Sequence, residues 1–227
     1  MDVRPLSDPP AMTSTSLVYL ASQSPRRLQL LQHWGLGCEL LLPTADEDAE
    51  ALEVVQPGEA PKHYVQRVTD LKLQAALARL AQRGLPVAPV LCADTTVALG
   101  RTILGKPASA DEACAMLRAL SGRKHRVLTA VAVGLPHGGT GGGHWSALSE
   151  SWVTFAPLSD AEIRAYVATG EPMGKAGAYA IQGLAAMWVP RIQGSYSGIM
   201  GLPAFETATL LRQAGIAWVG MGGTHGT

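Results

Sequence analysis

Two adjacent arginines at the start of an expected helix are the residues of this sequence that most clearly suggest chemistry. Arg26 and Arg27 follow Ser24 and Pro25, which suit the N-cap and the first position of an α-helix. The unpaired backbone N–H groups of the first turn and the positive end of the helix dipole would point outward beside both guanidinium groups. This arrangement favours an anion, phosphate above all. Taken alone, the motif is also compatible with an ordinary cap and two solvated arginines.

Two carboxylates could hold a cation that binds together with phosphates. Asp94 comes where the apolar segment 87–93 ends, and open α/β sheets bind their ligands at the ends of strands. Glu47 belongs to an acidic segment of the kind that is usually a solvated loop. If both converge on one place, they would offer oxygen ligands to Mg²⁺. The alternative for Asp94 is a turn or cap residue, and the two interpretations carry equal weight.

Two lysines and a glutamine could add charge and hydrogen bonds to such a site. Lys72 borders an apolar helical stripe, so its stem could follow the core while the ammonium reaches a cleft. Lys106 stands between Gly105 and Pro107 in an expected turn. The amide of Gln182, in a glycine-containing segment, can both donate to and accept from a base edge. Solvated lysines and an exposed strand residue are the ordinary alternatives.

Strands and helices that alternate along the chain must position these residues. We predict strands at 17–21, 39–42, 87–93, 96–99, 103–104, 127–133 and around 152–155, and helices from 25, over 61–83, from 109 to about 121, from 159 to 170 and from about 203 to 213. Before the last helix we expect two short apolar segments, 178–181 and 187–189, and a Gly/Ser turn at 194–198. The alternation with adjacent hairpins favours an α/β class, with a mixed twisted sheet flanked by helices.

The 227 residues suffice for one substantial core. We expect a flexible leader at 1–16, a single domain at 17–217 and a flexible tail at 218–227. A glycine-rich hairpin insertion is predicted at 136–146. Its glycine run, 138–143, is not a phosphate loop, because it lacks the Gly-Lys-Ser/Thr ending and no helix signal follows.

Composition excludes several classes of protein. A formal net charge of zero argues against a nucleic-acid or membrane-surface binder. No segment approaches the roughly 18 uninterrupted apolar residues of a membrane span. The histidines show no ligand spacing, and there is no Gly-x-Ser-x-Gly elbow, so a zinc site or a serine hydrolase is disfavoured. Cys38, Cys92 and Cys114 are odd in number and have apolar neighbours, which favours a reducing compartment, the cytoplasm.

Taken together, the motifs resemble the Maf (septum formation) family of nucleoside triphosphate pyrophosphatases. The resemblance runs from about Leu17 to Gly215. The motifs that carry it are, in chain order, Leu20-Ala21-Ser22 with Ser24-Pro25-Arg26-Arg27, Asp46-Glu47, Tyr64-Val65-x-Arg67 with Lys72, Ala93-Asp94-Thr95, Lys106-Pro107, Ser121-Gly122 with Thr129-Ala130-Val131, Gly170-Glu171-Pro172, and Lys175-Ala176-Gly177-Ala178-Tyr179 through Gln182-Gly183. The segment 1–16 and the glycine run depart from the family pattern but touch no motif.

The resemblance implies a fold like that of Maf proteins and inosine triphosphatases, with a central cleft. It also implies hydrolysis of a nucleoside triphosphate between the α and β phosphates with a divalent metal, Mg²⁺ or Mn²⁺. Carried over by motif, the catalytic residues would be Asp94, Glu47, Lys72 and Lys106, the metal ligands Asp94 and Glu47, and the substrate-binding residues Ser22, Ser24, Arg26, Arg27, Thr95 and Gln182. Within these sets, Asp94 matches the proton acceptor, and Arg27, Thr95 and Gln182 match the positions that mark the subfamily preferring dTTP and UTP.

We therefore expect an acid-anhydride hydrolase that cleans the nucleotide pool of pyrimidine triphosphates, including modified ones. Asp94 is favoured as the base and Glu47 as a metal ligand, although both carboxylates suit either role. The partner would be a small-molecule triphosphate, with neither nucleic acid nor membrane, and the resemblance suggests a homodimer. The alternative is a nucleotide-binding regulator of cell division that does not hydrolyse. Retention of Asp94 argues against it, because a sensor needs no water-activating carboxylate.

Overall fold

Seven strands form one mixed sheet in this computed structural model, which describes residues 17–44, 46–47, 51–136 and 142–216. The strands are β1 (Tyr19–Leu20), β2 (Glu39–Leu40), β3 (Val90–Leu99), β4 (Thr102–Leu104), β5 (Lys124–Leu135), β6 (Gly143–Thr154) and β7 (Arg191–Gln193). Their order is β2-β1-β3-β5-β6-β7, and β4 pairs with the end of β3. β2, β1 and β3 run parallel, whereas β3, β5, β6 and β7 run antiparallel. The predicted mixed sheet is confirmed.

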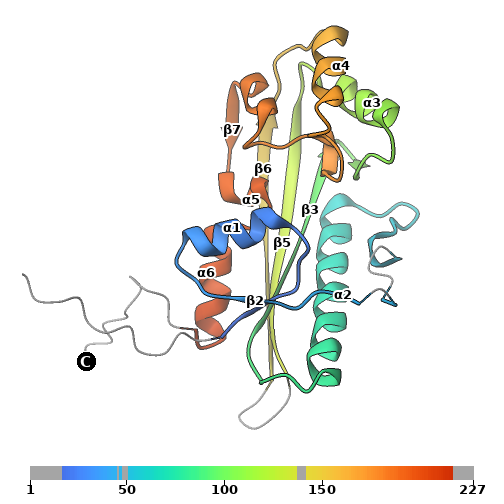
Figure 1. The fold of residues 1–227 in the computed structure, drawn as a ribbon. Coiled ribbons are helices and arrows are strands. Elements are labelled where there is room, and N and C mark those ends of the chain that lie inside the picture. The colour runs from blue at the N-terminus through green and yellow to red at the C-terminus, as the bar shows by residue number, and fades with distance from the viewer. Residues whose placement is uncertain (1–16, 45, 48–50, 137–141, 217–227) are drawn as a thin grey trace, which may run out of the picture.

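Helices cover both faces of this sheet. They are α1 (Pro25–His33), α2 (Pro61–Gln82), α3 (Ala110–Leu120), α4 (Asp160–Ala168), α5 (Tyr196–Met200) and α6 (Ala204–Gln213), with short 3₁₀ helices η1 (Ala51–Glu53), η2 (Ala176–Ala178) and η3 (Leu184–Trp188). Figure 1 shows α2 on one side of the long strands β3 and β5, and α1 with α6 on the other. The long helix predicted over 61–83 is thus the main cover of one face.

The two faces of β3 bury their side chains under different helices. Leu91 packs in one cluster with Leu31 of α1, and Cys92 packs in another with Leu73 of α2. Each of the four is at most 2% exposed. Burial of a leucine side chain contributes about 1.5–3 kcal/mol. Because both faces are covered, the first part of the strand, 90–93, is continuously apolar rather than alternating, as a buried strand should be.

β3 is longer than predicted, and Asp94 lies inside it rather than at its end. The sequence suggested two strands, 87–93 and 96–99, but one strand continues because β5 pairs with it along its length, with Asp94 opposite Ala130. β1, by contrast, pairs only with Val90 and Leu91. On that side, no described strand pairs with β3 again until Val97, which lies opposite Leu104 at the end of β4. Asp94 therefore lies beyond the end of β1. The strand end at which an open α/β sheet is expected to bind its ligand is thus the end of β1, not of β3.

Several other expectations need correction in the second half of the chain. The apolar segments expected at 178–181 and 187–189 overlap the 3₁₀ helices η2 and η3, so the strand considered as the alternative around Gln182 does not form. Gly177 and Ala178 have φ of 68° and 59°, which an extended strand cannot contain. The Gly/Ser turn at 194–198 includes the start of α5. The insertion expected at 136–146 is partly strand, because β6 already begins at Gly143.

Most helix starts fall where the capping residues predict them. Ser159 accepts a hydrogen bond from the backbone of Glu162, whose side chain accepts one in return, which completes the capping box of α4. Ser109 likewise accepts from the backbone of Glu112 at the start of α3. The expected leader, most of the glycine run and nearly all of the tail lie outside the described residues, and the domain limits stay a prediction.

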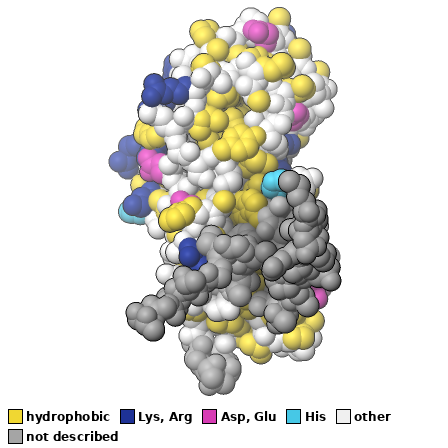
Figure 2. Space-filling model, turned by 90° about the vertical axis from the view of Figure 1, so that its left-hand side faces the viewer, with side chains coloured by type: hydrophobic (Ala, Val, Ile, Leu, Met, Phe, Trp, Pro, Cys, Tyr) yellow, Lys and Arg dark blue, Asp and Glu magenta, His cyan; other side chains and the backbone are white. Residues whose placement is uncertain are grey.

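One face of the molecule shows hydrophobic side chains gathered over its upper part (Figure 2). Phe205 on α6 is among the most exposed hydrophobic residues, at 77%.

In the described part of the chain, no helix has the length and apolar character needed to cross a membrane. The cysteines there are free: Cys92 and Cys114 are buried and Cys38 is half-buried.

Candidate active site

One cavity is lined by every site residue that the sequence predicts. Its volume is about 550 Å³, within the range of small-molecule sites. Its walls include 21–27, which follow β1, and 93–97 of β3. The cavity thus occupies the place beyond the end of β1. The ten predicted residues that line it are Ser22, Ser24, Arg26, Arg27, Glu47, Lys72, Asp94, Thr95, Lys106 and Gln182.

The start of α1 forms one wall, much as predicted. Pro25 is its first residue, and Ser24 holds the N-cap position with an extended backbone. The Ser24 side chain, however, makes no capping hydrogen bond; the Ser24 backbone N–H donates instead to Ser22 Oγ at 3.2 Å. Arg26 is half-buried, and its Nε donates to the Met200 carbonyl of α5 at 3.3 Å. The helix start is therefore braced by α5, which is distant in sequence.

Arg27 is held by three different partners. Its Nε donates to the Gly201 carbonyl at 2.7 Å, its Nη1 to Ser22 Oγ at 3.0 Å and its Nη2 to Thr95 Oγ1 at 3.3 Å. Burial lowers the pKa of Arg27, and the nearby Asp94 charge acts in the opposite direction. Arg27 and Thr95, two of the predicted base-selecting residues, are thus in direct contact. The third, Gln182, is exposed and lines the same cavity.

Four charged side chains alternate in sign at the centre of the cavity. Lys72 Nζ lies 2.6 Å from Asp94 Oδ1 and 2.7 Å from Glu53 Oε1, and Lys106 Nζ lies 2.7 Å from Glu53 Oε2. Burial lowers the pKa of Lys72, but the two carboxylates outweigh it and leave the pKa raised. For Glu53 the signs are reversed: burial raises its pKa, but the charges and hydrogen bonds of Lys72 and Lys106 outweigh burial and leave the pKa lowered. Lys72 and Glu53 are therefore charged at neutral pH.

Glu53 was not predicted, yet it joins the two lysines of the site. It ends η1, whose position is fixed by α2: the Tyr64 hydroxyl donates to the Glu53 carbonyl at 2.9 Å. Arg67 Nη2 donates to the next carbonyl, that of Val54, also at 2.9 Å. In the sequence, Glu53 is one of several acidic residues near Glu47. Charge alone does not show which of them folds back toward Lys72.

Glu47 lines the cavity but is engaged elsewhere. Both of its carboxylate oxygens accept hydrogen bonds from Arg79, with Nε to Oε1 at 2.8 Å, and its Oε1 also accepts from the Thr44 backbone at 3.2 Å. The hydrogen bond with Arg79 lowers the pKa of Glu47 to about 2. Among the described residues, Glu47 makes no ion pair with the Asp94 cluster. Its role as a metal ligand stays a prediction.

Arg79 is a second residue that the sequence did not reveal. It is buried, and besides Glu47 it binds the Leu41 carbonyl at 3.0 Å. It follows Lys72 by seven residues on α2, which places both side chains on one face of the helix. That spacing was the available signal, because two cations on the same helical face can reach the same cavity.

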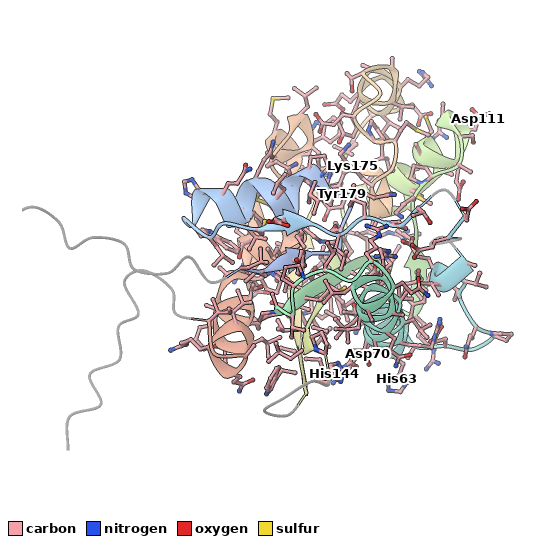
Figure 3. The ribbon with its side chains drawn as sticks, turned by 60° about the horizontal axis from the view of Figure 1, so that its bottom comes forward. His63, Asp70, Asp111, His144, Lys175 and Tyr179 are labelled. Atoms are coloured by element: carbon pink, nitrogen blue, oxygen red, sulfur yellow. The ribbon has the colours of Figure 1, made fainter. Side chains whose placement is uncertain are left out.

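Lys175 also lines the cavity, from the segment before η2. Its Nζ donates to the Glu171 carbonyl, and burial, followed by the charge of Arg26, lowers its pKa. Figure 3 shows Lys175 and Tyr179 together, well away from Asp70 and His144. The latter two form a surface pair at 3.2 Å. The surface pair therefore has no part in the cavity.

The carboxylates fit a hard divalent cation only together with a ligand. In the described ranges, no group of three or more His, Cys, Asp or Glu side chains could hold a metal ion. Asp94 and Glu53 share the Lys72 ammonium, and Glu47 lines the same cavity. Mg²⁺ is commonly bound through one or two carboxylates, with substrate phosphates and waters completing the shell. The donor set therefore suits Mg²⁺ that arrives with a polyphosphate.

Comparisons with known proteins agree with this picture. Residues 17–214 match the family model described as Maf-like protein. The dTTP/UTP pyrophosphatase of Cupriavidus metallidurans is 63% identical over 202 residues, covering 89% of this chain and 98% of that protein. The dTTP/UTP pyrophosphatase of Cupriavidus pinatubonensis is 64% identical over 201 residues, covering 87% and 96%. A solved nucleoside-triphosphatase (dITP/XTP pyrophosphatase) from Mycobacterium abscessus is 17% identical, with a TM-score of 0.40, over 86% of this chain and 93% of that one. This likeness is too distant to support an argument.

Proposed function

Because this chain belongs to the family of Maf-like proteins, we propose that it hydrolyses nucleoside triphosphates, dTTP and UTP above all, to the nucleoside monophosphate and pyrophosphate. The observation that carries the proposal is the single cavity lined by all ten predicted residues, with Asp94, Lys72 and Lys106 in one charged cluster. The relatives named for this activity match this chain over nearly all of their own length. Modified pyrimidine triphosphates are further substrates under the same proposal.

The basic residues neutralise the triphosphate. Lys72 and Lys106 approach it from the side of α2 and β4, and Arg26 from the start of α1. A triphosphate carries more negative charge than one cation can balance, so it needs positive groups from several directions. Fixed charges in a partly buried cavity also stabilise charge that develops in the transition state. Lys106, half-exposed, exchanges Glu53 for a phosphate oxygen at little cost, since exposed ion pairs contribute about 0–1 kcal/mol.

Asp94 is the proton acceptor in this proposal. One of its oxygens, Oδ1, accepts from Lys72, and no described residue donates a hydrogen bond to the other, which can accept a proton from water. The water oxygen then forms a bond to the α phosphorus, and the bond from that phosphorus to the bridging oxygen breaks. Pyrophosphate leaves with the electron pair of that bond. Lys72 orients the Asp94 carboxylate for this step.

A divalent cation, Mg²⁺ or Mn²⁺, would be held by Asp94 and a second carboxylate. The second is Glu47, as the sequence predicts, or Glu53, which already shares an ammonium with Asp94. When bound, the cation would polarise the phosphate oxygens and help to neutralise their charge. Arg27, Thr95 and Gln182 would bind the base, while Ser22 and Ser24 lie beside them at the start of α1.

Incubation with Mg²⁺ and a panel of canonical and modified triphosphates tests the proposal. We expect pyrophosphate and monophosphate from dTTP and UTP. Release of orthophosphate alone would exclude it, and tight binding without any cleavage would favour the non-hydrolysing regulator. A cytoplasmic location and a homodimer belong to the same proposal; cell fractionation and light scattering would test them.

A further inference from the structure

A row of hydroxyl groups connects Arg27 to the backbone of α5. Thr95 of β3 and Thr129 of β5 are directly paired across the sheet, and their Oγ1 atoms are 2.9 Å apart. Thr129 Oγ1 lies 2.7 Å from the Gly198 carbonyl oxygen, and Thr129 is only 1% exposed. Arg27 Nη2 completes the row at 3.3 Å from Thr95 Oγ1. The row leads from a buried position to the wall of the cavity.

Each hydrogen bond in this row has only one possible direction. A carbonyl oxygen can only accept, so the Thr129 hydroxyl gives its single proton to Gly198. Thr129 Oγ1 must then accept from Thr95, which uses the only hydroxyl proton that Thr95 has. A guanidinium can only donate, so Thr95 Oγ1 also accepts from Arg27. Thr95 is left with one acceptor position and no proton for a ligand.

We propose that Thr129 is a positioning residue for base selection: it fixes Thr95 as a pure hydrogen-bond acceptor and so favours uracil and thymine over cytosine. Thr95 lines the cavity, whereas Thr129 is not among the lining residues, so Thr129 acts through Thr95. The inference rests on the proposed function, because it takes Thr95 to be one of the residues that bind the base.

The chemistry of the bases supplies the selection. Uracil and thymine carry an N–H donor at ring position 3, which an acceptor-only Thr95 can bind. Cytosine has an unprotonated nitrogen there, so two acceptors would face each other without a proton between them. A site that leaves a buried polar group unpaired rejects the wrong ligand far more strongly than a purely apolar site does. Were Thr95 free to turn its proton toward the cavity, it could bind cytosine as well.

Replacement of the Thr129 hydroxyl by a methyl group tests this directly. In Thr129→Val, Thr95 loses its acceptor and regains a proton for the cavity. We expect the ratio of kcat/KM for UTP over CTP, and for dTTP over dCTP, to fall by about tenfold, mainly through a lower KM for the cytosine nucleotides. The Kd values of UMP and CMP, measured by calorimetry, should converge in the same way.

Thr129→Ser is the matched control, because it keeps the hydroxyl and should keep the ratios of the unchanged protein. If Thr129→Val does not fold, Thr129→Cys takes its place, since a thiol is only a weak donor and acceptor. An equal loss of kcat/KM for all four triphosphates would overturn the inference, because it would indicate a structural role alone. So would a Ser variant that behaves like the Val variant.

The two proposals fail in different ways. If the unchanged protein releases no pyrophosphate from any triphosphate, the proposed function is wrong. The UMP and CMP affinities then still decide the inference: a UMP preference that disappears in Thr129→Val supports it. Equal affinities for UMP and CMP in the unchanged protein would overturn it.

Discussion

At the scale of single residues, the centre of the cavity is a balance of two cations and two anions. Lys72 and Lys106 are matched by Asp94 and Glu53, so the formal charges of these four groups cancel. A triphosphate brings excess negative charge and must take over some of these cationic partners. Glu53 is the carboxylate that both lysines share, and its pairing with the exposed Lys106 is the easiest to exchange.

Replacement of Asp94 by asparagine should abolish turnover. The amide would keep the shape of the side chain and an acceptor for Lys72 but could not take a proton from water. We expect kcat to fall by about two to four orders of magnitude, as is typical when a general base is lost. Nucleotide affinity should persist, as measured by calorimetry. Activity equal to that of the unchanged protein would remove Asp94 from the role of base.

Replacement of Glu53 by glutamine should shift the pH profile. Glu53 helps to raise the pKa of Lys72, so its loss lowers the pH at which Lys72 loses its proton. The alkaline limb of kcat/KM, which reports the free enzyme, should move to lower pH, with about a tenfold loss at its alkaline end. Glu59→Gln is the control, because Glu59 pairs with Arg67 outside the cavity. A shift of the same size in both variants would contradict the expectation.

The ion pair of Glu47 with Arg79 should make stability depend on acid pH. The Glu47 pKa is lowered from 4.5 to about 2, so the unfolded chain binds more protons than the folded chain between these values. The contribution is therefore complete above about pH 4.5 and is lost as pH falls toward 2. Because a third of the side chain is exposed, we expect less than about 1 kcal/mol.

Urea unfolding of the unchanged protein and of Glu47→Gln, followed from pH 7 to pH 3, measures this contribution. The difference in the free energy of unfolding between the two proteins should shrink as the pH falls. A difference that stays constant over the whole range would mean that the carboxylate charge of Glu47 adds nothing to stability.

At the scale of elements, the cavity exists because β1 stops while β3 continues. The chain leaves β1 after Leu20 and turns into α1, and β3 runs on to Leu99 with β5 beside it. The opposite wall includes residues around η2, packed closely against β3. A Cβ added to Gly177 would lie 2.8 Å from Val97 Cγ1, closer than side-chain carbons approach one another. Gly177 thus allows this segment to approach the strand.

Replacement of Gly177 by alanine should lower stability through two effects. Its φ of 68° is unfavourable for alanine, and the new methyl group would collide with Val97. Gly174→Ala is the matched control: Gly174 has a φ of 70°, but nothing lies within 4 Å of an added Cβ. We expect a loss of about 1 kcal/mol for Gly174→Ala and about 2–4 kcal/mol for Gly177→Ala in urea unfolding. Equal losses of stability in the two variants would mean that the collision of the new methyl group with Val97 costs nothing.

At the scale of the whole molecule, a net charge of zero leaves the basic residues of the cavity as a local feature. With no excess of cations, the protein lacks the attraction for phosphate backbones that drives non-specific DNA binding. We expect no retardation of a duplex DNA in gel-shift assays at physiological salt, while dTTP still binds. Binding of the duplex with a steep salt dependence would contradict this. A homodimer stays a prediction.

Local sequence was enough to place most of the helices correctly. The N-cap position of α1, the capping box of α4 and the helical spacing on α2 all depend on residues within a few positions of each other. Such signals depend on hydrogen bonds and periodicity within one element, which the order of residues determines. The family motifs then marked Asp94, Thr95 and Gln182 without any knowledge of how far apart they lie.

Only the tertiary structure decided which partners these residues have. Glu53 meets Lys72 across 19 positions, Arg79 holds Glu47 across 32, and Thr129 meets Thr95 across 34. These contacts depend on the path of η1 over α2 and on the antiparallel register of β3 and β5. No local signal encodes them, because several acidic residues and several threonines are chemically equivalent in the sequence. The sequence by itself determined which groups are available for chemistry, and packing between distant segments decided which of them meet.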